Sequence, residues 1–539
     1  MSGVALAVLL GGVGEVAAQT TESYDVRAEV FAGGEIERYL RNLQLARAAN
    51  WYPWTVRAFS PGEVEGMARP DSTHPWGERF RITDGENGLV EYGWVRPRAG
   101  AIFNSAFPYG GNDGAVWSGR GITTAVEGGA WARVGPLSLV LAPVAFIAQN
   151  REFELHPASL SGERRFNDAR EGGSGIDLPQ RFGEGSYSRI SPGQSTVRLD
   201  LGPVAVAAST ANQYWGPAES NPLILGNNAE GYPHFLLGTS RPLNVGIGLV
   251  HGRMVWGRLE QSDYSPMPDP DALRFMSGFV GLFRPRGVPG LEIGMSRFFH
   301  SPWPEGGFSL DDFTKPLEGF LKVNVRGDEG STDNSDADNQ LASVFMRWAL
   351  PRIGFEAYAE YAREDHNWDF RDFMLEPDHD AAYLLGFRRV WAGDGRHWTV
   401  LRGEVMNAEV SHLFRVRTQT RFYRHGRMRQ GHTFEGQILG SQHGYGGAAT
   451  ELAVDRYEPW GRWTLAWNRA VYDRRGRYWQ EGLIERDAVD TGHALRAEAL
   501  WFHGELELFG RLEGLYRLNH YFEDDDVNLH AAFGVTWRP

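Results

Sequence analysis

The chain has 539 residues, a formal net charge of −14, no cysteine, 67 glycines and 19 tryptophans. The lack of cysteine excludes disulfide frameworks, thiolate metal sites and cysteine nucleophiles, and the acidic balance without a basic tract argues against a nucleic-acid partner. No apolar run approaches the roughly 18 residues of a membrane-spanning helix. The mean hydropathy of −0.40 is still compatible with a membrane barrel, because only half of the side chains of each strand face lipid.

The N-terminus has the pattern of a secretory signal. The stretch from Val4 to Val13 is apolar, and Val16-Ala17-Ala18 supplies the small residues of a signal-peptidase site. We therefore predict that residues 1–18 form a cleaved signal, although no Lys or Arg precedes the apolar stretch. The alternative is an ordinary N-terminus rich in small residues.

Residues 19–80 are predicted to form a small helical element in the periplasm. Ser60-Pro61-Gly62-Glu63 is a capping box with proline at the first helical position, which predicts a short helix through Met67. An earlier amphipathic helix is predicted between positions 35 and 49, where apolar residues recur at helical spacing. These residues are Ile36, Leu40, Leu43 and Ala46.

From about residue 81 the dominant pattern is alternation of apolar and polar side chains, which is typical of two-faced strands. Residues 195–217 contain a clear hairpin, with apolar positions alternating before and after the turn at Gly202-Pro203. The same period of two occurs over residues 355–361 and in the last segment, residues 527–537. The last segment is rich in aromatic residues and is predicted to close a barrel.

The connections alternate between short turns and long, polar, glycine-rich segments. Short turns are predicted at residues 135–136, 202–203, 284–290, 351–354, 392–396 and 459–462. Long segments are predicted at residues 151–194, 213–241, 301–339, 364–380 and 421–450. Outer-membrane barrels show this asymmetry, with short periplasmic turns and long external loops. A soluble sandwich would not require it, and the repeat of a propeller is absent from the sequence. We therefore predict an all-β fold, a large antiparallel transmembrane barrel over residues 81–539.

Two motifs carry a resemblance to a known family. Trp215-Gly216-Pro217 is followed by Leu223-Ile224-Leu225-Gly226-Asn227-Asn228-Ala229, and a second element runs from Gly436 to Gly444. Together with a weaker match at residues 54–61, these motifs resemble the Wzi family of outer-membrane capsule-assembly proteins. The resemblance implies about 18 strands, within the range known for such barrels, and a role in holding or assembling polysaccharide at the cell surface.

The motif region also contains candidate polysaccharide contacts. Aromatic rings pack against the C–H faces of sugars, and amides pair with their hydroxyl groups. The alternative is structural, because a Trp-Gly-Pro segment can pack a loop and asparagine tolerates its backbone conformation. The candidates are Asn212, Gln213, Tyr214, Trp215, Asn227 and Asn228.

A basic run stands out in this acidic protein, because guanidinium groups pair with carboxylate and phosphate groups. It is predicted to contact acidic polysaccharide or lipopolysaccharide, and the alternative is a loop that faces its own acidic neighbours. The run consists of Arg421, Arg424, His425, Arg427 and Arg429.

Neither a metal nor a cofactor is expected. Carboxylate-rich segments at residues 333–338, 364–366, 378–380 and 523–526 could hold Ca²⁺, but solvated loops account for them as well. The sequence contains no G-x-S-x-G elbow, no H-E-x-x-H motif and no phosphate-binding glycine loop. We therefore expect a non-enzymatic protein of the outer membrane.

The expected partners are surface polysaccharide, outer-membrane lipid, lipopolysaccharide and other capsule-export components. Two alternatives to polysaccharide binding stay open at this point. A diffusion channel would need charged residues along an open lumen. A membrane-embedded hydrolase would need a nucleophile assembled from distant strands.

Overall fold

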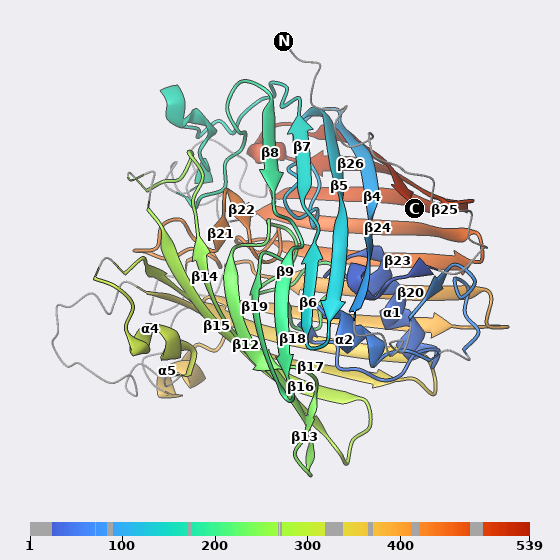
Figure 1. Cartoon of the computed structure of the whole chain (residues 1–539). Helices are drawn as coiled ribbons and strands as arrows, with labels where there is room; N and C mark the ends of the chain where they lie inside the picture. The colour runs from blue at the N-terminus through green and yellow to red at the C-terminus, as the bar shows by residue number, and fades with distance from the viewer. Residues whose placement is uncertain are drawn as a thin grey trace.

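The computed structural model describes residues 24–69, 72–82, 90–170, 175–267, 269, 272–304, 306–317, 338–364, 370–410, 420–474 and 489–539. Within this part of the chain, eighteen antiparallel strands close into one barrel (Figure 1). The prediction of a large antiparallel barrel is therefore confirmed. The predicted signal segment, residues 1–18, lies outside the described residues.

Three of the eighteen strands are interrupted, so each carries two labels. β6 and β7 both pair with β5, β8 and β9 pair with β7 and β6, and β12 and β13 both pair with β14. The barrel strands are β4 (Val90–Asn104), β5 (Gly121–Val134), β6 (Leu137–Leu141), β7 (Val144–Ala148), β8 (Tyr187–Ser191), β9 (Thr196–Leu201), β10 (Val204–Ser209), β12 (His234–Thr239), β13 (Leu243–Asn244), β14 (Gly248–Leu259), β15 (Arg274–Pro285), β16 (Leu291–Pro302), β17 (Asn339–Leu350), β18 (Phe355–Glu364), β19 (Ala381–Trp391), β20 (Trp398–Asn407), β23 (Ala448–Glu458), β24 (Gly461–Asp473), β25 (Asp490–His503), β26 (Leu506–Leu518) and β27 (Asp526–Trp537).

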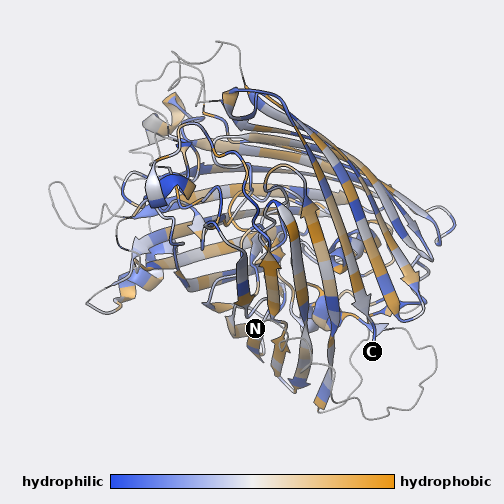
Figure 2. Cartoon of the chain, turned by 90° about the horizontal axis from the view of Figure 1, so that it is seen from above, coloured by the Kyte–Doolittle hydropathy of each residue, from blue (hydrophilic) through white to orange (hydrophobic). Residues whose placement is uncertain are grey.

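The last strand closes the barrel, as its period of two predicts. β27 pairs with β4 in a register that joins His530 to Asn104 and Thr536 to Arg98. Phe533 of β27 is 56% exposed on the outer face, whereas His530 is 1% exposed and faces the lumen. Hydrophobic and hydrophilic residues alternate along many of the barrel strands (Figure 2). Closure pairs the backbone groups that an open edge would leave unsatisfied in lipid.

Short turns gather at one end of the barrel and long connections at the other. The predicted turns all fall on short connections, including Gly202-Pro203 between β9 and β10, where Gly202 has a φ of 61°. Two of the predicted long segments are shorter than expected, because residues 151–194 contain β8 and residues 213–241 contain β12. Buried and exposed positions do alternate along β12, over His234, Phe235, Leu236 and Leu237. The glycines and prolines around this short strand make its pattern hard to recognise in the sequence.

The N-terminal part of the chain enters the barrel from the short-turn end. Two helices form there, α1 (Glu35–Leu45) and α2 (Pro61–Glu65), and α2 begins with the predicted capping box between Ser60 and Glu63. Their apolar side chains pack against inward-facing residues at the short-turn ends of the strands, such as Trp398 and Tyr457. We call residues 24–69 and 72–82 the N-terminal insert.

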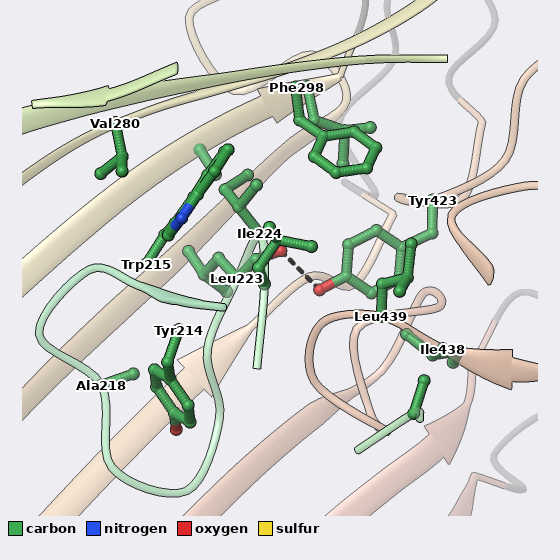
Figure 3. Close-up of a cluster of buried hydrophobic side chains, with 14 of the residues drawn as sticks. Tyr214, Trp215, Ala218, Leu223, Ile224, Val280, Phe298, Tyr423, Ile438 and Leu439 are labelled. Atoms are coloured by element: carbon green, nitrogen blue, oxygen red, sulfur yellow. Dashed lines mark hydrogen bonds between the residues drawn. The ribbon is translucent and has the colours of Figure 1, made fainter. Parts of the chain in front are cut away.

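Two long connections fold back into the lumen from the opposite end, and we call residues 210–233 and 420–447 together the loop insert. Its side chains form one apolar cluster with the inner faces of β14 to β20 (Figure 3). The two inserts meet in the lumen, where β2 (Val56–Arg57) pairs antiparallel with β11 (Tyr214–Trp215).

The remaining elements are short. No helix in the described part of the chain is long and apolar enough to cross a membrane. These elements are β1 (Tyr24–Asp25), η1 (Arg27–Glu29), β3 (Phe80–Arg81), η2 (Gly162–Phe166), α4 (Leu310–Thr314), η3 (Lys315–Leu317), α5 (Phe370–Leu375), β21 (Thr433–Phe434), β22 (Gln437–Ile438) and η6 (His520–Phe522).

Candidate functional site

The structure places the first four candidate residues, at positions 212–215, inside the loop insert. Tyr214 and Trp215 are 0% exposed. The Tyr214 hydroxyl donates to the Glu219 carbonyl at 2.7 Å, and the ring of Trp215 meets that of Phe298 edge-on at 6.2 Å. Asn212 donates to two loop carbonyls at 2.9 and 3.0 Å, and Gln213 lies 3.2 Å from the Nε2 atom of His234. These contacts organise the loop from within, so its shape depends on them.

Asn227 and Asn228 join the loop insert to other connections. The Asn227 amide donates to the Asn112 carbonyl at 3.0 Å. The Asn228 amide donates to the Ile438 carbonyl at 2.9 Å, which links the two motifs of the loop insert. Buried polar groups are usually hydrogen-bonded, as the buried Asn228 side chain is. The two asparagines therefore bind three connections into one unit.

The two segments of the loop insert are also held together by Tyr423 and His432. The Tyr423 hydroxyl donates to the Leu223 carbonyl at 2.6 Å, as Figure 3 shows. His432 donates from Nε2 to the Ile224 carbonyl at 2.6 Å, and its Nδ1 accepts from His300 at 3.0 Å. Burial lowers the pKa of His432 to about 3, so the ring is neutral at pH 7.

The basic run is divided by the fold. Arg421 is 0% exposed and pairs with Asp473 at 2.8 Å. Arg424 is half-buried, whereas Arg427 is exposed at the long-loop end. Arg429 continues the run into a surface groove, so the outer members of the run, not Arg421, face solvent.

The groove beside Arg429 has a volume of about 950 Å³ and lies among the long connections. Phe166 of η2 and Tyr264 form its aromatic side, with ring centroids 5.9 Å apart at 87°. The Arg165 guanidinium lies 4.6 Å from the centroid of Phe166. Arg164 is exposed at the groove, and no carboxylate of the described residues lies within 4.0 Å of its guanidinium.

This groove combines an aromatic face, guanidinium groups and amide or hydroxyl groups, which together suit a sugar chain. The sequence pattern did not reveal it, because residues 163–167, residues 263–267 and Arg429 come from three separate connections. The one available signal was the polar, glycine-rich character of residues 151–194, within which η2 forms.

A second, interior cavity of about 160 Å³ lies between the loop insert and the wall formed by β23 to β27. Glu219 enters it from the loop insert and pairs with Arg38 at 3.2 Å and with Arg388. Burial opposes ionisation of Glu219, but the guanidinium groups of Arg388, Arg402 and Arg38 hold its pKa well below the ordinary range. The cavity is therefore polar and charged, in contrast to the apolar packing on the other side of the lumen.

Among the residues that the structure describes, no group of three or more His, Asp or Glu side chains is arranged to hold a metal ion. Of the predicted carboxylate-rich segments, residues 333–337 and 365–366 lie outside the described residues. Asp380 pairs with His379 at 3.1 Å, and Asp526 interacts with His520 at 2.5 Å.

Comparison with protein-family models gives one match. The model described as capsule assembly protein Wzi matches residues 148–460. This range contains the loop insert, η2 and the whole of the surface groove. Among curated protein sequences, no significant match is found.

Comparison with solved structures gives several matches. The Escherichia coli outer-membrane protein Wzi, described as a carbohydrate-binding β-barrel involved in group 1 capsule assembly, is 14% identical with a TM-score of 0.55, over 83% of this chain and 85% of that one. Acinetobacter baumannii OccAB2 is 10% identical with a TM-score of 0.40, over 83% of this chain and 98% of that one. Pseudomonas aeruginosa OccK2 is 9% identical with a TM-score of 0.41, over 83% and 97%.

Proposed function

This chain belongs to the capsule assembly protein Wzi family, whose model matches more than half of its length, and on that premise we propose that it binds polysaccharide at the cell surface. The polysaccharide is capsular or another exopolysaccharide. The family match carries the proposal, because the matched range includes every connection that forms the surface groove. The structural likeness to Wzi is consistent with it at the level of the fold.

The proposed contacts are the outer members of the basic run together with the groove. Arg427 is exposed and Arg424 is half-buried, so both can reach a glycan above the loop insert. Arg164, Arg429 and Tyr264 offer guanidinium and aromatic groups in the groove. The other candidate residues would then act indirectly, by fixing the loops that present these groups. They are Asn212, Gln213, Tyr214, Trp215, Asn227, Asn228 and Arg421.

The proposed role is non-enzymatic, at the outer membrane, with the N-terminal insert on the periplasmic side and residues 1–18 as a cleaved signal. In this orientation the long connections are external, as in other bacterial outer-membrane barrels. The apolar cluster of the loop insert fills the lumen beside β14 to β20, which disfavours a wide diffusion channel.

The test is the ratio of cell-attached to shed polysaccharide in cells that lack the gene and carry either the wild type or a variant. A triple substitution of Arg164, Arg427 and Arg429 to Gln is expected to lower attachment at unchanged total synthesis. Arg286→Gln is the matched control, since Arg286 is exposed on a short turn at the opposite end. An unchanged ratio in the deletion strain would refute polysaccharide binding, and planar-bilayer conductance of the purified barrel would then test the channel.

A further inference from the structure

A groove of about 700 Å³ lies on the outer wall of the barrel, close to the long-loop end. Its floor is formed by outward-facing side chains of β9, β10 and β12, including Val197, Ala208 and Phe235. Phe235 is 66% exposed and Val197 47% exposed. The groove is therefore continuous with the apolar face that the strands present to lipid.

One side of the groove is built by a connection that folds back onto the outer wall. Residues 303–317, which include α4, follow β16, and Figure 1 shows α4 beside β15. Trp256 of β14 donates from its ring nitrogen to the Phe313 carbonyl at 3.0 Å. We call residues 303–304 and 306–317 the flap.

The flap contributes aromatic rings rather than polar groups. Phe275 faces outward from β15 yet is only 4% exposed, because flap residues cover it. Its ring centroid lies 4.8 Å from that of Phe308 and 5.8 Å from that of Phe313. Phe308 itself is 44% exposed at the groove, so an apolar wall remains open to a ligand.

The polar groups of the groove lie at one edge. Ser195 and Thr210, next to the long-loop ends of β9 and β10, line the groove, as does Arg258 of β14. The Arg258 side chain is 47% exposed, and its ion pair among the described residues is with Glu260, which directly follows β14. An apolar groove with a cationic edge matches a lipid whose acyl chain lies in the groove and whose phosphate lies at that edge.

We propose that this groove binds one acyl chain of the lipid A portion of lipopolysaccharide. The groove lies at the long-loop end of the strands, which faces the outer leaflet when the long connections are external. The aromatic cluster of the flap is positioned where interfacial aromatic girdles occur in such barrels. The groove opens on the lipid-facing wall and is separate from the glycan groove among the long connections.

The test uses the full-length protein purified in detergent, titrated with hexa-acylated lipid A and measured by native mass spectrometry. Ala208→Trp fills the groove from the lipid-facing side of β10. Val206→Trp is the matched control, because Val206 faces lipid on the same strand, two residues away, but does not line the groove. Heat-modifiable migration on gels verifies that both variants form the barrel.

We expect one tightly held lipid A per wild-type chain and about tenfold weaker binding to Ala208→Trp, the loss for roughly two methylene groups displaced from apolar contact. Val206→Trp should bind as the wild type does. Equal affinity of Ala208→Trp and wild type would overturn the proposal, as would equal weakening by both tryptophans. Phosphatidylethanolamine binding as tightly as lipid A would also overturn it, because the groove would then be a general lipid contact.

If Ala208→Trp does not assemble, the flap provides an independent pair of variants outside the barrel wall. Phe308→Ala removes an aromatic wall of the groove and should weaken lipid A binding. Leu310→Ala is its control, since Leu310 is 77% exposed on the flap but does not line the groove. Lipid A binding that is unaffected by Phe308→Ala would reject the site. The measurement contains no glycan, so its outcome is independent of polysaccharide binding.

Discussion

The two inserts occupy the same lumen, and both pack apolar side chains against the barrel, but they differ in how much buried charge attaches them to it. The N-terminal insert is anchored by buried charges: Glu63 contacts Arg253 at 3.2 Å and Arg198 at 3.3 Å, and Arg41 pairs with Glu356 at 2.7 Å. The loop insert is held mainly by apolar packing and by hydrogen bonds from side chains to backbone carbonyls. It has fewer buried ion pairs to the wall, from Glu219 to Arg388 and from Arg421 to Asp473.

The difference follows from how each insert is connected. The loop insert is tied to the wall at both ends of each segment by strands, so non-directional packing is enough to position it. The N-terminal insert precedes the barrel in the chain and is tied to a barrel strand only where it leads into β4. Buried ion pairs are costly when mismatched, and so they favour one arrangement over others. Charge pairing therefore contributes more to the location of the N-terminal insert, while packing contributes more to the shape of the loop insert.

The largest expected effect comes from breaking the central anchor of the N-terminal insert. Burial alone would raise the pKa of Glu63, but Arg253 and Arg198 hold it well below the ordinary range. Glu63→Gln leaves the buried Arg253 without its anion and leaves Arg198 with Asp200 alone, which should cost about 3–5 kcal/mol. Hydrogen exchange in residues 35–67 measures the loss. Glu78→Gln, at an exposed position of the same insert, is the control. Unchanged exchange in Glu63→Gln would contradict the charge-anchored arrangement.

A smaller effect is expected from the loop insert. The Tyr423 hydroxyl donates to the Leu223 carbonyl at 2.6 Å and accepts from the Ser441 amide at 3.1 Å. Tyr423→Phe leaves both backbone groups without this partner, at a cost of about 1–3 kcal/mol. Limited proteolysis of residues 420–447 measures the loosening. If the variant instead destabilises the N-terminal insert equally, the two inserts are not separate units.

The pH dependence of the loop insert should be carried in part by His432. Its folded pKa is about 3, below the unfolded value of about 6.5. The unfolded loop insert therefore binds a proton at His432 that the folded loop insert excludes. The stability of the folded loop insert falls as the pH drops below about 6.5, by up to about 1.4 kcal/mol per pH unit. His432→Gln should flatten the pH profile of proteolysis, whereas His503→Gln, at the exposed end of β25, should leave it unchanged. Identical slopes in both variants would exclude this role.

The smallest effect is expected for a charge pair at the surface. Arg165 pairs with Glu184 beside the glycan groove, with side-chain exposures of 37% and 75%. Glu184→Gln should change the thermal midpoint by no more than the equivalent of about 0–1 kcal/mol, because water screens exposed pairs. A loss similar to that of Glu63→Gln would show that burial does not set the strength of these pairs.

The sequence predicts the wall better than the lumen, for a physical reason. A period of two and the turn at Gly202-Pro203 are local, so β9, β10 and β27 can be recognised from neighbouring residues alone. The burial of Tyr214 and Trp215 cannot be predicted from their sequence neighbours, because it depends on contacts with Phe298 and with residues 423–439, which are far away in the chain. The surface groove likewise joins Phe166, Tyr264 and Arg429 only after the barrel has closed.

The β2–β11 pairing gives the barrel a mechanical property. Trp215 pairs with Val56 and Tyr214 with Arg57, and the Gly216 amide donates to the Thr55 carbonyl at 2.9 Å. This ladder joins a segment that descends from the long-loop end to one that rises from the short-turn end. Tension on the long connections is thus shared, through backbone hydrogen bonds in the lumen, with the insert at the other end of the barrel.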